Sequence, residues 1–156
     1  MMWNKIRPYV GFSAAALAVG GLSALLTGGG MRDFAALNQP PLSPPAWLFP
    51  VVWTILYTLM GVAAWRIWQS SAPGREAALG FYIAQLVFNF FWPLLYFGAE
   101  LFGAALVWLL ALWVLILLTI RKFSAIDRTA GRLLIPYLLW VTFAVYLNAG
   151  VWILNR

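Results

Sequence analysis

The side chains of this sequence that are best suited to binding chemistry are aromatic rings and amides at helical spacing. They form three groups: Trp53 with Tyr57; Gln85, Asn89 and Trp92; and Trp140, Ala144 and Leu147. Within each group the residues are three or four positions apart, so on a helix they share one face. Stacked indoles with a few amide groups suit a flat, largely apolar ligand. Taken alone, Gln85 and Asn89 are explained equally well by hydrogen bonds between helices.

Most conventional catalytic chemistry is excluded by residues that the sequence lacks. The chain has no His and no Cys. It therefore cannot build a zinc or copper site with these ligands, an iron–sulfur cluster, a Cys nucleophile or a Ser-His-Asp triad. Its four acidic residues, Asp33, Glu76, Glu100 and Asp127, do not lie deep in any apolar stretch, which argues against a carboxylate proton relay. We expect no bound metal and no cofactor.

The elements that must position the aromatic groups are membrane-spanning helices. The 156 residues are 64% hydrophobic and 9% charged, with a mean hydropathy of +0.87, whereas about a quarter of a soluble domain is charged. Five uncharged stretches approach the ~20 residues that cross a bilayer as a helix. We predict an all-α integral membrane protein, a single five-transmembrane-helix bundle over residues 1–156. The predicted spans cover about residues 9–27, 46–68, 77–99, 101–122 and 130–154, and loop one, residues 28–45, forms a lid.

The distribution of basic residues predicts the orientation in the membrane. Eight lie at the N-terminus or around the second and fourth loops: Lys5, Arg7, Arg66, Arg75, Arg121, Lys122, Arg128 and Arg132. Arg32 and Arg156 lie on the other side. The positive-inside rule then places the N-terminus in the cytoplasm and the C-terminus outside. Helical spans are typical of inner membranes, so we expect a bacterial cell membrane. The net charge of +6 forms no continuous stripe, so we expect no nucleic acid partner.

Small residues and prolines interrupt the apolar pattern at defined points. Ala16, Gly20 and Ala24 recur every fourth residue, a spacing that lets two helices approach closely. We favour packing within the monomer over dimerisation through this stripe. Pro93 and Pro136 predict kinks in the third and fifth spans. Four prolines in loop one favour a stiff, extended strap.

The ten Trp residues divide by their predicted positions on the helices. Five are interpreted as anchors at the membrane interface, two as packing residues, and three remain for a ligand site. In that order they are Trp3, Trp47, Trp65, Trp68 and Trp152; Trp108 and Trp113; and Trp53, Trp92 and Trp140.

Three spaced sequence blocks resemble one known family. The first is the run P-P-L-S-P-P-A-W-L-F-P-V-V-W-T-I-L-Y at residues 40–57. The second is F-Y-x-x-Q-L-x-x-N-x-x-W at residues 81–92, and the third runs from Pro136-Tyr137-x-x-Trp140 to Leu147-Asn148. In this order on these spans, the blocks are similar to those of the tryptophan-rich sensory protein or translocator protein (TspO, peripheral benzodiazepine receptor) family, over nearly the whole chain.

The resemblance implies a five-helix bundle in the lipid bilayer, commonly a homodimer, that binds small molecules. Its ligands would be porphyrins, haem-like tetrapyrroles, sterols and synthetic isoquinolines or benzodiazepines. By position, the residues that match the family's pocket are Trp53, Tyr57, Asn89, Trp92, Trp140, Ala144 and Leu147. Loop one would form the lid, with Phe34 and Pro44 facing the ligand and Gln85 adding a polar group from the third span.

Loop one departs from the family pattern. Members typically read Trp-Tyr-x-x-Leu-x-Lys-Pro-x-Trp-x-Pro-Pro, and this chain has Asp33 and Leu42 at the Trp positions. Phe34 replaces the Tyr and Gln39 the Lys. A porphyrin carboxylate therefore has no lysine partner in this lid.

The leading hypothesis for function is a membrane receptor or regulator that binds tetrapyrroles in an aromatic pocket between the second, third and fifth spans. An alternative implied by the resemblance is light- and oxygen-dependent porphyrin degradation, with Trp53 and Trp140 as the catalytic residues. A porphyrin or sterol transporter, or a partner in a membrane assembly, is a third alternative. Transport finds no support in charged lining residues or inverted repeats.

Overall fold

A computed structural model describes residues 2–28 and 30–156 of the chain. The helices are α1 (Met2–Thr27), α2 (Gly30–Ala35), α3 (Leu48–Trp68), α4 (Arg75–Pro93), the π-helix η1 (Leu94–Gly98), α5 (Phe102–Ile126), α6 (Arg128–Leu133) and α7 (Ile135–Leu154). In the described part of the chain, five helical segments are long and apolar enough to cross a membrane: α1, α3, α4 with η1, α5, and α6 with α7. The predicted all-α, five-span fold is confirmed.

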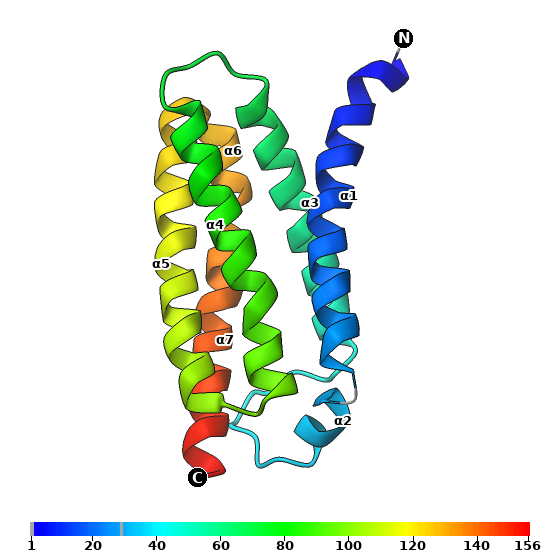
Figure 1. Ribbon diagram of the computed structural model, residues 1–156, viewed down its shortest axis with the longest axis vertical. Coiled ribbons are helices and arrows are strands. Elements are labelled where there is room, and N and C mark those ends of the chain that lie inside the picture. Colours follow the sequence, from blue (N-terminus) through cyan, green and yellow to red (C-terminus); the bar gives the residue numbers. More distant parts are fainter. Residues whose placement is uncertain (1, 29) are drawn as a thin grey trace.

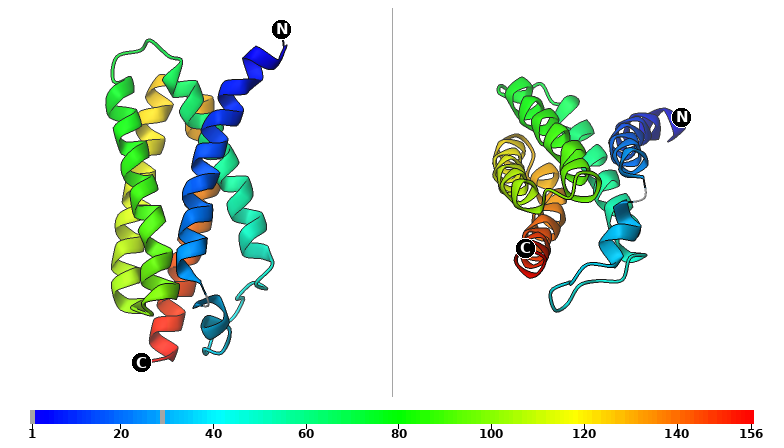
Figure 2. Two further views of the ribbon diagram at one scale, coloured as in Figure 1. Left: turned by 45° about the vertical axis from the view of Figure 1, so that its right-hand side comes forward. Right: turned by 60° about the horizontal axis from the view of Figure 1, so that its bottom comes forward.

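The spans stand side by side, with α1 at the margin of the bundle (Figures 1 and 2). α1 packs mainly on α3, and α5 lies between α4 and α7. The N-terminus, the α3–α4 connection and α6 are at one end, and α2, loop one and the C-terminus are at the other (Figure 1). The eight basic residues assigned to one side therefore share one end of the bundle.

The core is formed by one face of each inner helix. On α5 the buried side chains are Ala105, Leu109, Leu112, Ile116, Thr119 and Phe123, a spacing of three or four residues that matches the helical repeat. Residues on the opposite face, such as Val107 and Val114, are exposed and would contact lipid. Because lipid is as apolar as these side chains, close packing and hydrogen bonds hold the helices together.

α1 approaches α3 at glycines. A Cβ atom at Gly61 would overlap the backbone of Ser13, and one at Gly20 would overlap the ring of Tyr57. The Ser13 hydroxyl donates a hydrogen bond to the carbonyl oxygen of Thr58 at 3.0 Å. Ala16, the first residue of the small-residue stripe, is buried. At Ala16 and Gly20 the stripe therefore serves packing within the monomer.

The two prolines that predict kinks, Pro93 and Pro136, lie where one helix gives way to the next. α4 ends at Pro93 and continues as the π-helix η1, since proline lacks the N–H that the α-helical pattern requires at that point. Pro136 lies in the first turn of α7, directly after the break at Leu134, where proline is favoured. α1 begins at Met2, seven residues before the predicted start, because Lys5 and Arg7 interrupt the apolar run but not the helix.

Loop one is a short helix followed by an irregular segment tied to α7. Phe34 of α2 packs against Tyr96 and Phe97, with ring centroids 5.5 and 5.3 Å away. The Asn38 N–H donates to Asn155 Oδ1 at 3.0 Å, and Asn155 Nδ2 donates back to the Asn38 carbonyl at 2.8 Å. The predicted extended strap thus begins only after α2.

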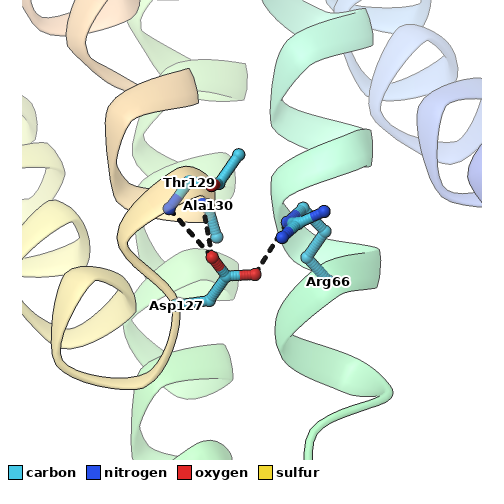
Figure 3. A network of polar contacts seen from close by, with 4 residues as sticks. All are labelled: Arg66, Asp127, Thr129 and Ala130. Carbon is cyan, nitrogen blue, oxygen red and sulfur yellow. Dashed lines mark hydrogen bonds and ion pairs between the residues drawn. The ribbon is translucent and has the colours of Figure 1, made fainter.

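An ion pair at the other end joins α3 to α6 (Figure 3). Arg66 Nε donates to Asp127 Oδ2 at 2.7 Å, while Asp127 Oδ1 accepts from the N–H groups of Thr129 and Ala130 at 2.8 and 3.3 Å. Asp127 is therefore the N-cap of α6. Desolvation raises the pKa of Asp127, but the hydrogen bonds from Arg66, Ala130 and Thr129 outweigh it and hold the pKa below the ordinary value of 3.8.

Asp127→Ala removes both the cap and the ion pair. We expect it to lower the free energy of unfolding in detergent micelles by about 1–2 kcal/mol. Asp127→Asn keeps the cap and should cost less than about 1 kcal/mol, because the ion pair is partly exposed.

A lowered folded-state pKa of Asp127 stabilises the protein above the unfolded pKa, and this contribution is lost as the pH falls through the folded pKa. The difference in unfolding free energy between native protein and Asp127→Asn should therefore shrink as the pH falls below the ordinary pKa of 3.8. A difference that does not change with pH in this range would contradict the assignment.

Candidate functional site

A cavity of about 530 Å³ lies between α1, α3, α4, η1 and α7. Its volume falls within the ~300–1,000 Å³ of typical small-molecule sites. Six residues predicted for the site line it: Trp53, Tyr57, Asn89, Trp92, Trp140 and Ala144. Periodicity on α3, α4 and α7 thus brings residues from three sequence blocks to one cavity.

Four other predicted residues lie elsewhere. Phe34 and Leu147 line a second, smaller cavity of about 20 Å³. This cavity shares Phe49, Trp92, Phe97 and Ala144 with the main one. Pro44 lines neither cavity, and Gln85 is buried one helical turn away from Asn89.

The wall formed by α1 is absent from the sequence prediction. Leu17, Gly20, Gly21, Ser23 and Ala24 are among its members. The spacing of Gly20 and Ala24 does point to a close helix contact, but small side chains carry no chemistry that marks a ligand wall. Phe49 on α3 and Phe97 on η1 are further lining residues that were not assigned to the site.

Aromatic rings form much of the opposite wall. Trp53 and Tyr57 lie with ring centroids 5.5 Å apart, and Phe49 meets Trp140 edge-on at 5.8 Å. Trp53 also meets Tyr137 edge-on at 6.2 Å. These separations fall in the range favoured by aromatic pairs, so the rings support one another around the cavity.

Behind this wall runs a chain of buried hydrogen bonds. The Tyr57 hydroxyl donates to Asn89 Oδ1 at 2.5 Å, and Asn89 Nδ2 donates to the Tyr137 oxygen at 2.6 Å. The Tyr137 hydroxyl donates in turn to Gln85 Oε1 at 2.7 Å. The chain joins α3, α4 and α7. Tyr137 is a member that reasoning from residue spacing did not single out, although it lies in the third motif block.

Trp92 is held by a separate hydrogen bond. Its indole Nε1 donates to Asn148 Oδ1 at 3.2 Å, and Asn148 Nδ2 donates to the Phe102 carbonyl at 2.8 Å. On the other side of the cavity, the Ser23 hydroxyl donates to the Phe90 carbonyl at 2.7 Å. These bonds fix α4 relative to α7, the start of α5, and α1.

The cavity is uncharged. None of its lining residues is Asp, Glu, Lys or Arg, and the described residues contain no group of His, Cys, Asp or Glu suited to a metal ion. The side chains can stack, exclude water and form a few hydrogen bonds. The arrangement suits an apolar molecule.

The cavity reaches the surface of the bundle between α1 and α3. Gly21 and Ala24 on α1, and Pro50 and Thr54 on α3, line the cavity and are exposed. All four belong to segments of membrane-spanning helices. The opening therefore faces the lipid.

Gly20→Ala tests how closely α1 is fitted to the site. A Cβ at Gly20 overlaps the ring of Tyr57, whereas a Cβ at Gly21 meets no atom within 4 Å. We expect Gly20→Ala to lower the free energy of unfolding by about 1–3 kcal/mol through overpacking. The neighbouring control Gly21→Ala should be neutral or slightly stabilising, because alanine favours the helix. Chemical denaturation in micelles compares the two, and equal effects would argue against the contact.

Known proteins resemble this chain over most of its length. The profile of the TspO/MBR family matches residues 12–153. The "Tryptophan-rich sensory protein" of Cereibacter sphaeroides is 42% identical over 119 residues, 76% of this chain and 74% of that protein. The "Translocator protein" of Bos taurus is 38% identical over 149 residues, 93% and 88% of the two chains, and that of Homo sapiens is 38% identical over 133 residues, 83% and 79%. The resemblance predicted from the three sequence blocks is confirmed: this integral membrane protein belongs to the TspO/MBR family.

Proposed function

We propose that the protein is a membrane receptor or regulator that binds a tetrapyrrole in the cavity between α1, α3, α4 and α7. The observation that carries the proposal is an uncharged cavity of about 530 Å³ with Trp53, Trp92 and Trp140 among its lining residues. Indole rings present large flat faces on which a conjugated macrocycle stacks. Sterols and synthetic isoquinolines or benzodiazepines share the flat, apolar character and are further candidate ligands.

The charge distribution supports one orientation of a porphyrin. Its carboxylates find no cationic partner on the cavity wall, and burying an unpaired carboxylate is costly. Gln39, at the position of the family's lysine, donates to the Phe34 carbonyl at 3.3 Å. The carboxylates would therefore lie toward the α1–α3 opening or the interface, with the apolar edge of the macrocycle inside.

The position of the basic residues supports the predicted orientation of the whole protein. Arg66, Arg75 and α6 lie at the end of the bundle that carries the N-terminus (Figure 1). The positive-inside rule places this end in the cytoplasm. Loop one and the lining residues Phe49 and Phe97 then lie toward the outer face.

Protoporphyrin binding tests the proposal. We expect the purified protein in micelles to bind protoporphyrin, and Trp140→Ala to weaken binding about tenfold through loss of an aromatic wall. The measurement is the change in porphyrin absorption on titration with protein.

The matched control is Trp113→Ala. Trp113 is outside the cavity, and its indole donates to Thr142 Oγ1 at 2.8 Å. This variant should bind protoporphyrin like the native protein. No binding by the native chain, or an equal loss in both variants, would argue against the proposed site.

Porphyrin degradation is a second candidate function. The indoles of Trp53 and Trp140 both line the cavity, where either would meet a photo-excited macrocycle and could pass an electron to it. In that case, illumination in air should bleach the bound porphyrin faster than free porphyrin. The acceleration should be lost in Trp53→Phe with Trp140→Phe. Equal bleaching rates for free and bound porphyrin leave binding as the function.

A further inference from the structure

The direction of the buried hydrogen-bond chain determines whether Tyr57 offers a ligand a donor or an acceptor. Tyr57 and Asn89 line the cavity, while Tyr137 and Gln85 lie behind it. Each amide and hydroxyl in such a chain can reverse its donor and acceptor roles only if all its neighbours reverse too. A group at the far end therefore controls the group at the cavity.

The far end of the chain is the thioether of Met60. Gln85 Nε2 lies 3.9 Å from Met60 Sδ, and both residues are buried, with exposed fractions of 1% and 0%. A thioether sulfur accepts a weak hydrogen bond but has no proton to donate. The Gln85 NH₂ group must therefore face Met60, since the opposite orientation would set the amide oxygen against another acceptor.

The orientation of Gln85 fixes the donor and acceptor of every other hydrogen bond in the chain. With its NH₂ on Met60, Gln85 presents Oε1 and accepts from the Tyr137 hydroxyl. Tyr137 then accepts from Asn89 Nδ2, and Asn89 accepts from the Tyr57 hydroxyl. The Tyr57 proton is committed to Asn89. What remains at Tyr57 is an oxygen lone pair, which is an acceptor.

We propose that Gln85 and Met60 set the ligand preference of the cavity by holding Tyr57 as a hydrogen-bond acceptor, so that the site selects flat apolar ligands with a hydroxyl or N–H at their edge. Gln85 is a positioning residue, since it lines no cavity. The inference rests on the proposed function and adds to it a specificity that aromatic stacking alone does not supply. A ligand edge that carries only acceptors meets the Tyr57 lone pair without a proton between them.

Removing the Gln85 amide should reverse the chain. In Gln85→Leu the Tyr137 hydroxyl has no acceptor except Asn89 Oδ1, and leaving a buried donor unpaired is costly. Asn89 then turns its NH₂ group to the Tyr57 oxygen. The Tyr57 proton is released toward the cavity, and the site becomes a donor without any change in a ring that touches the ligand.

Three fluorescent probes of nearly equal shape read out this change: hydroxypyrene, methoxypyrene and pyrene. Energy transfer from Trp to the probe, corrected for protein-free micelles, gives the affinity of each. We expect the native chain to bind hydroxypyrene about three- to tenfold more tightly than methoxypyrene, as for one hydrogen bond. In Gln85→Leu the ratio of the two affinities should fall to about one or below, because the Tyr57 hydroxyl can then donate a hydrogen bond to the methoxy oxygen.

The matched control is Thr119→Val, which removes a fully buried hydroxyl that bonds only to the Leu115 carbonyl of its own helix. It should keep the native ratio. Tyr57→Phe is a second variant, which retains the ring and removes the oxygen; it should bring both probes to the affinity expected from pyrene. A general loss of stability changes all affinities together and leaves the ratio unchanged.

The outcomes separate this inference from the proposed function. A native chain that does not favour hydroxypyrene, including one that binds no pyrene at all, overturns the inference. So does a native ratio retained in Gln85→Leu, or in Tyr57→Phe if Gln85→Leu does not fold. None of these results decides the outcome of the protoporphyrin titration, which tests the proposed function separately.

Discussion

Within a bilayer a polar side chain has no water to bind, so its partners must come from the protein. The amides of Gln85, Asn89 and Asn148 meet this constraint by bonding to aromatic residues on other helices. Among the described residues, no buried polar side-chain atom lacks a partner. Because each of these bonds joins two helices, they fix α3, α4 and α7 relative to one another, and the cavity is the space that this arrangement leaves open.

α1 has a different role from the other spans. It contributes few buried side chains, Ser13, Ala16 and Ser23. Beside the cavity it approaches the bundle through small residues and hydroxyl groups, which allow close approach of the helices, and nearer the N-terminus Tyr9 and Phe12 pack against Trp65 of α3. α1 therefore closes a site whose geometry the inner helices determine.

The sequence predicts the spans and the inward faces because both depend on local periodicity. Trp53 and Tyr57, or Asn89 and Trp92, are close along one helix, and their shared face follows from their spacing. The path from Asn89 to Tyr137 and back to Gln85 is different, since it depends on how α4 and α7 are rotated against each other. No spacing within one helix contains that information.

Two further features also depend on tertiary structure. The π-helix after Pro93 turns Tyr96 and Phe97 toward Phe34 of α2, whereas the sequence indicates only that the α-helix is interrupted. The wall formed by Gly20 and Gly21 cannot be recognised from residue type, because a glycine lines a cavity only by what its neighbours leave empty. Helix-face reasoning therefore finds the cavity-lining residues on the motif faces of α3, α4 and α7, and it misses the small residues of α1 together with Phe49 and Phe97.

The exposed positions of Gly21, Ala24, Pro50 and Thr54 at the mouth of the cavity determine which solvent the ligand leaves when it binds. An apolar molecule that enters between α1 and α3 comes from the hydrocarbon, where it is already dehydrated, so transfer from water contributes nothing to this step. The binding free energy then depends on the difference between two interaction energies. One is that of the molecule with the indole faces and one hydrogen bond in the cavity, and the other is that of the molecule with the acyl chains. An affinity referred to the aqueous concentration includes the partition coefficient of the ligand, and a change of lipid composition alters that apparent affinity without any change in the protein.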